Sequence, residues 1–345
     1  TGEIYFFVAI IDGRLTASYT DNTADLAVLE NRILEEHGDA PPSGAYFCEP
    51  HGQRMWFLRT DTNPQTAYWS DPGDPDSMLT TANFLTFKDA ETQGDVITGA
   101  RGDYEGMLVV FQERSVWTVS GTGEVIGNVN DWTRTRTNAQ TGSVSHRTVV
   151  RVPAGSKYID QKGEVQTTAT AALAYLTPLL DIRLFDGDND LVISHPKATQ
   201  LSTMNYTNRA KAFAVADVER SEITWVYPDG TNAEPNKAVT WNYRWGLWYE
   251  REWAFGHATQ MDASNDSSLL VAGEAVLATG GFVYLLWSGN SADGANFKSQ
   301  WMTKTFYGVN EQGQPSMSHR KRWRWADFLF EVDQTVSLTL EWVEG

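Results

Sequence analysis

Cysteine, basic residues and long apolar runs are all scarce in this sequence. Cys48 is the only cysteine among 345 residues, so the chain cannot form a disulfide of its own, and a disulfide-built secreted fold is not expected. Lys and Arg number 27 against 44 Asp and Glu, and the resulting net charge of −17 argues against a dedicated nucleic-acid-binding protein. The longest apolar run covers residues 4–11, far short of the roughly 20 residues that span a bilayer.

Helical periodicity is also rare. Apolar residues recur at helical spacing over residues 24–36, and the Ala- and Leu-rich segment 168–180 is a second short candidate. Most of the remaining chain consists of short segments rich in Val, Ile, Tyr, Phe, Trp and Thr, which Gly, Asn, Asp and Pro separate. The sequence therefore predicts an all-β fold.

The predicted strands occur in groups of three or four. Residues 107–112 are apolar almost throughout, which is typical of a strand covered on both faces. Successive groups are about 45 to 60 residues apart, close to the spacing of propeller blades. Because radial packing hides both apolar faces of each group, we expect an irregular β-propeller of about five to seven blades. A stack of β-sandwiches is the alternative.

These groups suggest three domains. Residues 1–43 would form an N-terminal hairpin, turning at Asp12-Gly13, with a short helix and a linker. Residues 44–290 would form the propeller. Residues 291–345 would form a smaller β-rich docking domain, completed by the N-terminal hairpin because chain ends often meet. Since the chain begins at Thr1 and not at Met, we also expect residues to precede it.

No catalytic set is evident in the sequence. The six histidines are dispersed, and no nucleophile elbow, phosphate loop or dinucleotide fingerprint is present. We expect Cys48, within a predicted strand, to be a buried and unreactive thiol. Asp71, Asp74 and Asp76 are the densest acidic group, and an Asp/Pro turn is favoured over the acid pair of a glycosidase. We therefore predict no catalytic residues and no cofactor.

Two further motifs have a possible binding role. Asp186, Asp188 and Asp190 alternate as the ligands of a calcium loop do, but the Gly and Glu that such a loop requires further on are missing. A solvated acidic turn is therefore favoured, and the three aspartates remain weak metal candidates. Residues 101–103 spell the integrin-binding tripeptide Arg-Gly-Asp, for which a plain turn is the favoured interpretation.

A basic segment with interleaved tryptophans occupies residues 319–325. If it is extended, Arg320, Arg322 and Arg324 share one face, and Lys321 lies on the other face with two tryptophans. Arginine beside tryptophan suits contact with DNA phosphates or bases. The acidic background of the chain favours instead ion pairs with a neighbouring strand or subunit.

Several segments resemble one protein family. Residues 96–119 contain an apolar strand, a charged turn and a Ser-apolar-aromatic strand, and this order resembles a blade of the tail hub or nozzle proteins of short-tailed bacteriophages. Similar blade-like segments cover residues 44–57, 68–73, 145–150 and 157–163, and residues 320–342 are similar to the basic, strand-rich end of those proteins. The likeness lies in order and pattern and covers most of the chain, but an N-terminal region expected of the family is absent.

The resemblance implies a structural role without enzymatic residues. It implies a propeller with a β-rich docking domain, assembled as a ring of about six copies beneath the portal and the head-to-tail adaptor. Such a ring extends the DNA channel, retains the packaged genome and supports distal tail parts. The expected partners are thus the chain itself, the adaptor, other tail proteins and passing double-stranded DNA, with no membrane. The expected location is the virion tail, after assembly in the host cytoplasm.

The acidic composition agrees with this hypothesis, because an acidic wall would let DNA slide through a conduit without adsorbing. The alternative is a carbohydrate-active propeller, either a hydrolase or a lectin, which the 14 Trp, 13 Tyr and 15 Phe residues suggest. A propeller that serves as a scaffold for other proteins is a third hypothesis.

Overall fold

The computed structural model consists almost entirely of antiparallel β-sheet. It describes residues 40–78, 83–91, 94–123, 125–126, 129–251, 255–262, 268–274 and 283–285, with residue 20 and the short pieces 5–6, 33–34, 308–309 and 315–316. Helical structure in these parts is limited to η1 (His146–Thr148), η2 (His195–Lys197), α2 (Ala198–Leu201) and η3 (Arg209–Lys211). The prediction of an all-β fold is confirmed. No helix in the described residues is long and apolar enough to cross a membrane.

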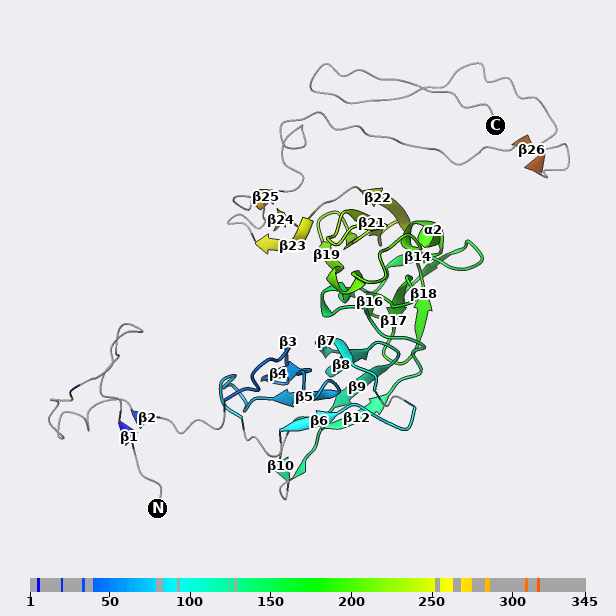
Figure 1. Ribbon diagram of the computed structural model, residues 1–345. Coiled ribbons are helices and arrows are strands. Elements are labelled where there is room, and N and C mark those ends of the chain that lie inside the picture. Colours follow the sequence, from blue (N-terminus) through cyan, green and yellow to red (C-terminus); the bar gives the residue numbers. More distant parts are fainter. Residues whose placement is uncertain are drawn as a thin grey trace. The chain divides into compact units, whose positions relative to one another are not determined.

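Four sheets of four strands follow one another along the chain (Figure 1). Sheet 1 contains β3 (Phe47–His51), β4 (Arg54–Leu58), β5 (Thr66–Trp69) and β6 (Phe84–Thr86). Sheet 2 contains β7 (Ile97–Tyr104), β8 (Met107–Gln112), β9 (Val116–Ser120) and β12 (Thr133–Arg136). Sheet 3 contains β13 (Val150–Val152), β16 (Ala172–Leu176), β17 (Ile182–Phe185) and β18 (Asp190–Val192). Sheet 4 contains β19 (Phe213–Asp217), β20 (Glu222–Tyr227), β21 (Lys237–Asn242) and β22 (Leu247–Arg251).

The other strands form smaller sheets. Sheet 5 has three strands, β23 (Phe255–Asp262), β24 (Ser268–Glu274) and β25 (Val283–Leu285). Four two-stranded pairs complete the set: β1 (Tyr5–Phe6) with β2 (Ile33–Leu34), β10 (Val125–Ile126) with β11 (Val129–Asn130), β14 (Lys157–Ile159) with β15 (Val165–Thr167), and β26 (Gly308–Val309) with β27 (Pro315–Ser316). The chain divides into two compact units, Thr1–Ser288 and Gly289–Gly345.

Neighbouring sheets pack face to face, because successive side chains of a strand point to opposite faces. In β8, Leu108 and Val110 pack with the tryptophans of sheet 1, whereas Val109 and Phe111 pack with sheet 3. All four side chains are therefore fully buried. The prediction that residues 107–112 form a strand covered on both faces is confirmed at these positions.

Sheets 3 and 4 repeat this arrangement. In β16, Leu173 and Tyr175 pack towards sheet 2, and the alternate residues Ala174 and Leu176 pack towards sheet 4. In β20, Trp225 packs towards sheet 3, whereas Val226 joins a smaller cluster with residues of β23. Sheets 2, 3 and 4 thus each share one core with the sheet before them and another with the sheet after them.

The first strands of consecutive sheets lie side by side. β3 lies beside β7, β13 beside β19, and β19 beside β23, while η1 contacts both β7 and β19. The fourth strand of each sheet pairs only with the third within the described residues. We call the edge formed by β3, β7, η1, β13, β19 and β23 the first-strand edge, and the edges formed by β6, β12, β18 and β22 the last-strand edges.

The predicted helix over 168–180 is wrong. Residues 172–176 form β16, a central strand with every side chain buried between β13 and β17. Ala and Leu favour a helix in isolation, but two strand partners and two apolar faces override that local preference. The strand pattern of the sequence also suggests one group made of residues 148–152, 157–160 and 164–168. That grouping is wrong, because β14 and β15 form a separate hairpin inserted between β13 and β16.

The predicted helix over 24–36 is wrong at Ile33 and Leu34. These two residues form β2, which pairs with β1, so their backbone groups bond to another strand and not along a helix. The rest of that segment and the Asp12-Gly13 turn lie outside the described residues.

Candidate functional site

Five titratable side chains meet at the first-strand edge of sheets 1 and 2: Glu49 and His51 from β3, Arg101 and Asp103 from β7, and His146 from η1. We call these five residues the edge cluster. Because successive side chains of a strand point to opposite faces, Glu49 and His51 of β3 point to the same face. Cys48 and Pro50 are exposed, whereas Glu49 and His51 are only 7% and 4% exposed and face the neighbouring strand β7.

Gly102 allows β7 to approach β3 closely. A Cβ atom at this position would lie 1.9 Å from the Pro50 carbonyl oxygen, so no other residue fits without a backbone shift. The backbone N–H of Gly102 donates to Glu49 Oε1 at 2.9 Å. The pairing of β7 with β8 is irregular between Arg101 and Tyr104, and Asp103 has a φ of 50°. Such a bulge redirects side chains, and here it brings Asp103 to His51.

Glu49 is held by three groups. Besides the Gly102 N–H, a guanidinium nitrogen of Arg101 lies 3.7 Å from Oε1, and His146 Nε2 lies 3.7 Å from Oε2. The Glu49 side chain is only 10% exposed, so its charge is removed from water and depends on these neighbours. The carboxylate therefore links β3 to β7 and to η1.

His51 makes a second link between the two strands. Its Nδ1 lies 2.8 Å from a carboxylate oxygen of Asp103, and the imidazole packs 5.5 Å from the Trp132 ring, centroid to centroid. Its Nε2 is buried and has no hydrogen-bond partner in the part of the chain that the structure describes. Because that nitrogen is closed off from solvent, His51 cannot deliver a proton to an external substrate through it.

His146 is the most perturbed member of the edge cluster. Its Nδ1 accepts the Ala100 N–H at 3.3 Å, and the imidazole stacks on Phe47 at 4.7 Å. Burial and the neighbouring Arg101 charge lower the pKa of His146 to about 4. The imidazole is therefore neutral at pH 7, and its contact with Glu49 is not an ion pair.

The arginines at this edge tie one sheet to another. Arg101 of sheet 2 donates to the carbonyl of Val149, just before β13, and Arg151 of sheet 3 donates back to the carbonyl of Gly102. Arg147 reaches β23, where it donates to the Gly256 carbonyl at 2.7 Å and lies 2.6 Å from His257 Nδ1. These cations therefore hold the sheets together through backbone carbonyls.

The edge cluster has the residue types of an acid–base site but not the arrangement of one. Within the described residues, no hydroxyl or thiol hydrogen-bonds either His51 or His146, so no activated nucleophile is formed. No group of three His, Cys, Asp or Glu side chains in these residues could hold a metal ion. The contacts that the structure shows join β3 to β7 and to η1.

Cys48 corrects another prediction. We expected a buried thiol, but Cys48 is exposed, on the side of β3 opposite to Glu49 and His51. The general tendency of cysteine to be buried gives way here to strand alternation, which assigns the inward positions to the two titratable side chains.

The three alternating aspartates after β17 do not converge. Asp190 accepts hydrogen bonds from Arg183 and the Tyr175 hydroxyl, both at 3.0 Å, and its side chain is 1% exposed. Asp188 accepts from the Asn138 side chain at 2.8 Å, and Asp186 accepts two backbone N–H groups of its own turn. The acidic-turn interpretation holds for Asp186 and Asp188. It is wrong for Asp190, which is buried and paired with an arginine.

The remaining motifs have different outcomes. Residues 71–77 form turns in which the Ser77 hydroxyl donates to Asp71 at 2.8 Å, as the Asp/Pro-turn interpretation predicted. Residues 101–103 lie in β7, so the interpretation of Arg-Gly-Asp as a plain turn is wrong, because the bulged strand pairs with β8 on one side. The basic cluster of Arg320, Lys321, Arg322 and Arg324 lies outside the described residues.

Sequence reasoning missed the edge cluster. The sequence predicts a turn at His51-Gly52, but the strand β3 extends to His51, so Glu49 and His51 are two residues apart on one strand and share one face. The partners could not be found in this way, because residues 101–103 and 146 are distant in the chain. Only the packing of β7 and η1 against β3 brings them together.

Comparison with known proteins adds little to this description. No protein-family model matches the chain, and no curated protein matches its sequence. Among solved structures, a luciferin-regenerating enzyme aligns with 68% of this chain and 85% of its own, at 11% sequence identity and a TM-score of 0.23. A likeness of this size supports no conclusion about fold or function.

Proposed function

We propose that this chain is a structural protein of a virion, a tail nozzle or hub component of a short-tailed bacteriophage. In this role, copies form a ring below the portal and adaptor, line and gate the DNA exit channel, and support the distal tail parts. The observation that carries the proposal is the edge cluster. Its buried carboxylate, its imidazoles and the nearby arginines are engaged in links between strands and sheets, so they serve the architecture of the protein.

The arrangement of the sheets supports a propeller-like body for this role. Five consecutive sheets share cores in chain order, and their first strands lie side by side, as the innermost strands of propeller blades do. The net charge of −17 per chain supports a conduit, because the summed field of several copies repels DNA phosphates.

Native mass spectrometry and negative-stain images of the full-length chain test the proposal. We expect a closed ring of identical copies around a hole wide enough for duplex DNA. A protein that remains a monomer at the highest attainable concentration, and that does not associate with tail particles, would contradict it.

A carbohydrate-binding or carbohydrate-cleaving protein is the second candidate, and exposed aromatic side chains favour it. Tyr206 and Trp245 are 58% and 56% exposed, and such flat apolar surfaces stack on sugar rings. A glycan array together with a hydrolysis screen separates the two candidates. Specific glycan binding or turnover by the monomer would favour the second.

A further inference from the structure

The turn between β21 and β22 presents an exposed tryptophan. Trp245 is 56% exposed, although tryptophans elsewhere in sheet 4, such as Trp225 and Trp241, are fully buried. On β22, Leu247 and Tyr249 are 48% and 37% exposed and point to the same side of the strand, because they are two residues apart. Three large apolar side chains therefore lie open to solvent within one hairpin.

The backbone of this turn is tightly held. Trp245 N–H donates to Asn242 Oδ1 at 3.1 Å, and Gly246 N–H donates to the Asn242 carbonyl at 2.8 Å. Gly246 has a φ of 71°, and a Cβ there would lie 3.3 Å from the Lys157 carbonyl oxygen. The β14–β15 hairpin braces the turn, since Lys157 N–H donates to the Tyr243 carbonyl at 2.7 Å. A tryptophan on a rigid turn loses little conformational entropy when it is covered.

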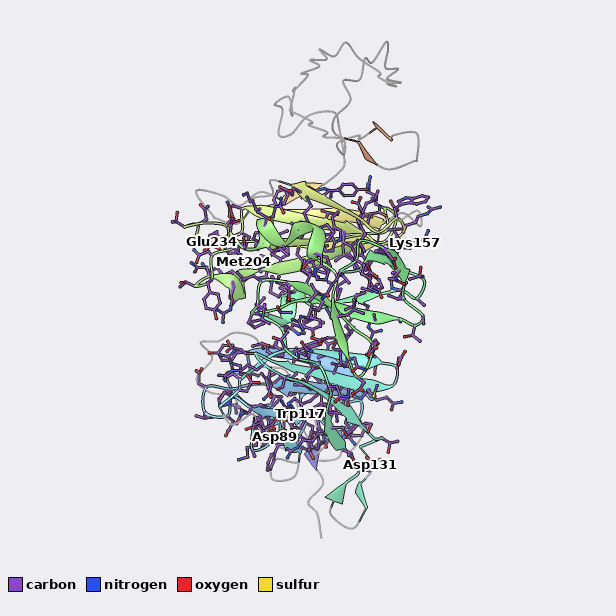
Figure 2. The ribbon with its side chains drawn as sticks, turned by 90° about the vertical axis from the view of Figure 1, so that its right-hand side faces the viewer. Asp89, Trp117, Asp131, Lys157, Met204 and Glu234 are labelled. Carbon is purple, nitrogen blue, oxygen red and sulfur yellow. The ribbon has the colours of Figure 1, made fainter. Side chains whose placement is uncertain are left out.

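Two cations flank the exposed indole. Lys157 Nζ lies 5.7 Å from the centroid of the Trp245 ring, and the Arg244 guanidinium carbon lies 5.2 Å from it; Figure 2 labels Lys157. Neither cation has a carboxylate within 4 Å among the residues that the structure describes, in contrast to Arg251 on β22, which pairs with Glu222 at 2.9 Å. The surface formed by Lys157, Arg244, Trp245, Leu247 and Tyr249, which we call the Trp245 surface, thus combines three exposed large apolar side chains with two cations.

We propose that the Trp245 surface is the contact through which a second copy of this chain docks, by means of an acidic face of that copy. The inference rests on the proposed function, which requires contacts between copies, and it assigns one side of that contact. An exposed aromatic anchor with arginine beside it has the composition of an interface hot spot.

Charge complementarity identifies the occupant. A chain with 44 acidic and 27 basic residues offers acidic surface, for example at the exposed Asp186 and Asp188, which a cationic surface would match. The Trp245 surface provides such a match. Because a cationic, apolar face would meet a different, acidic face, the contact is head-to-tail, and contacts of this type close into rings when the rotation permits.

The test compares variants of the full-length chain by sedimentation velocity over a concentration series. Trp245→Ala removes the aromatic anchor. The double variant Lys157→Glu/Arg244→Glu reverses the two positive charges beside it. Tyr206→Ala is the matched control, because Tyr206 is 58% exposed and lies under Arg209 at 3.7 Å, outside the Trp245 surface. We expect the first two variants to weaken self-association about tenfold or more and the control to leave it unchanged. A higher salt concentration should weaken self-association of the wild type but have little effect on self-association of the charge-reversed variant.

Each result of this experiment either supports or overturns the docking inference. If the wild type assembles and Trp245→Ala assembles equally well, the docking inference is overturned while the proposed ring stands. If the wild type does not self-associate at all, both the inference and the proposed function are overturned. If the variants lose binding to a short DNA duplex or to a glycan but keep the wild-type association, the surface has another occupant and the inference is wrong. Circular dichroism melting of each variant shows whether it is folded.

Discussion

β7 and β22 are both edge strands of four-stranded sheets, but their charged side chains have different surroundings. Around β7, Arg101 and the nearby Arg151 donate to carbonyls of neighbouring sheets, and the Glu49 side chain that pairs with Arg101 is 10% exposed. On β22, the Glu250 side chain is 51% exposed and forms a single ion pair with Lys197 at 2.6 Å. Charge at the first-strand edge is therefore part of the packing, whereas the charge of Glu250 on β22 lies at the surface.

The physical consequence is a difference in what each charge contributes. A buried charge that loses its partner has no water to replace it, so the protein loses much of its free energy of unfolding. An exposed pair loses little, because solvent replaces the missing partner. This contrast leads us to expect a first-strand edge that tolerates few substitutions and a β22 surface that is free to change for binding.

The largest effect is expected from Gly102→Ala at the first-strand edge. The new Cβ would lie 1.9 Å from the Pro50 carbonyl oxygen, and β3 and β7 would have to separate. We expect a loss of about 3 kcal/mol in the free energy of unfolding, measured by urea denaturation. Gly155→Ala is the control, since Gly155 has a φ of 80° but no atom within 4 Å of its added Cβ, and only about 1 kcal/mol should be lost there. Equal losses in the two variants would mean that β7 does not depend on this close approach.

Two glutamates provide the most direct comparison of the two environments. Glu49→Ala removes the acceptor of the Gly102 N–H and the partner of Arg101, and we expect it to cost about 2 to 3 kcal/mol in the free energy of unfolding. Glu250→Ala breaks the pair with Lys197, in which the carboxylate is half exposed, and should cost about 1 kcal/mol or less. Similar values for both variants would contradict the distinction between the two strands.

The parts of the fold that the sequence predicts are those with local signals. The sequence pattern predicts strands over residues 107–112, 222–227 and 247–251, and β8, β20 and β22 match these ranges. Their apolar residues and flanking turns lie within a few residues of one another. β16 was missed, since its Ala and Leu residues favour a helix and only its neighbours β13 and β17 make it a strand. The fourth strands β6, β12 and β18 were also missed, and they are short and partly exposed.

The candidate site could not be predicted in the same way. Asp190 belongs to a motif that resembles a calcium loop, and its actual partner, Arg183, is visible only when β17 and β18 are paired. The members of the edge cluster are separated by up to about a hundred residues in the chain, so no spacing rule connects them. The exposure of Cys48 could not be predicted either, because it depends on which face of β3 meets β7.

Acid should weaken the first-strand edge through His146. The pKa of His146 is lowered to about 4 in the folded protein, so protons bind more readily to the unfolded chain. The associated stability is fully present above pH 6.5, the ordinary range for histidine, and is lost as the pH falls towards 4. We expect wild-type unfolding free energy to decrease by about 2 kcal/mol between pH 7 and pH 5 from this group alone. His146→Gln should remove that part of the slope, and an unchanged slope would show that His146 is protonated as easily in the folded state.

The smallest expected effect comes from a buried carboxylate that forms no ion pair among the described residues. Asp95 is 4% exposed; its Oδ2 accepts from the Ser115 hydroxyl at 3.1 Å and the Arg114 N–H at 3.2 Å, while Oδ1 has no hydrogen-bond partner in the described residues. Burial raises the pKa of Asp95, so the stability that this group contributes is greatest at low pH and is lost as the pH rises through the folded-state value.

Asp95→Asn should therefore stabilise the protein at pH 7, by up to about 1 kcal/mol, and the gain should shrink as the pH is lowered to 4. Urea denaturation of both proteins at pH 7 and pH 4 measures the stabilisation at each pH. A variant that is less stable than the wild type at pH 7 would show that the Asp95 charge is compensated by a group that the packing brings to Oδ1. In that case Asp95, like Glu49, would be a buried carboxylate with a partner that compensates its charge. A gain would instead separate the two carboxylates: Glu49, which pairs with Arg101, stabilises the joint between sheets, whereas the charge of Asp95, which has no ion pair in the described residues, lowers the stability of the fold.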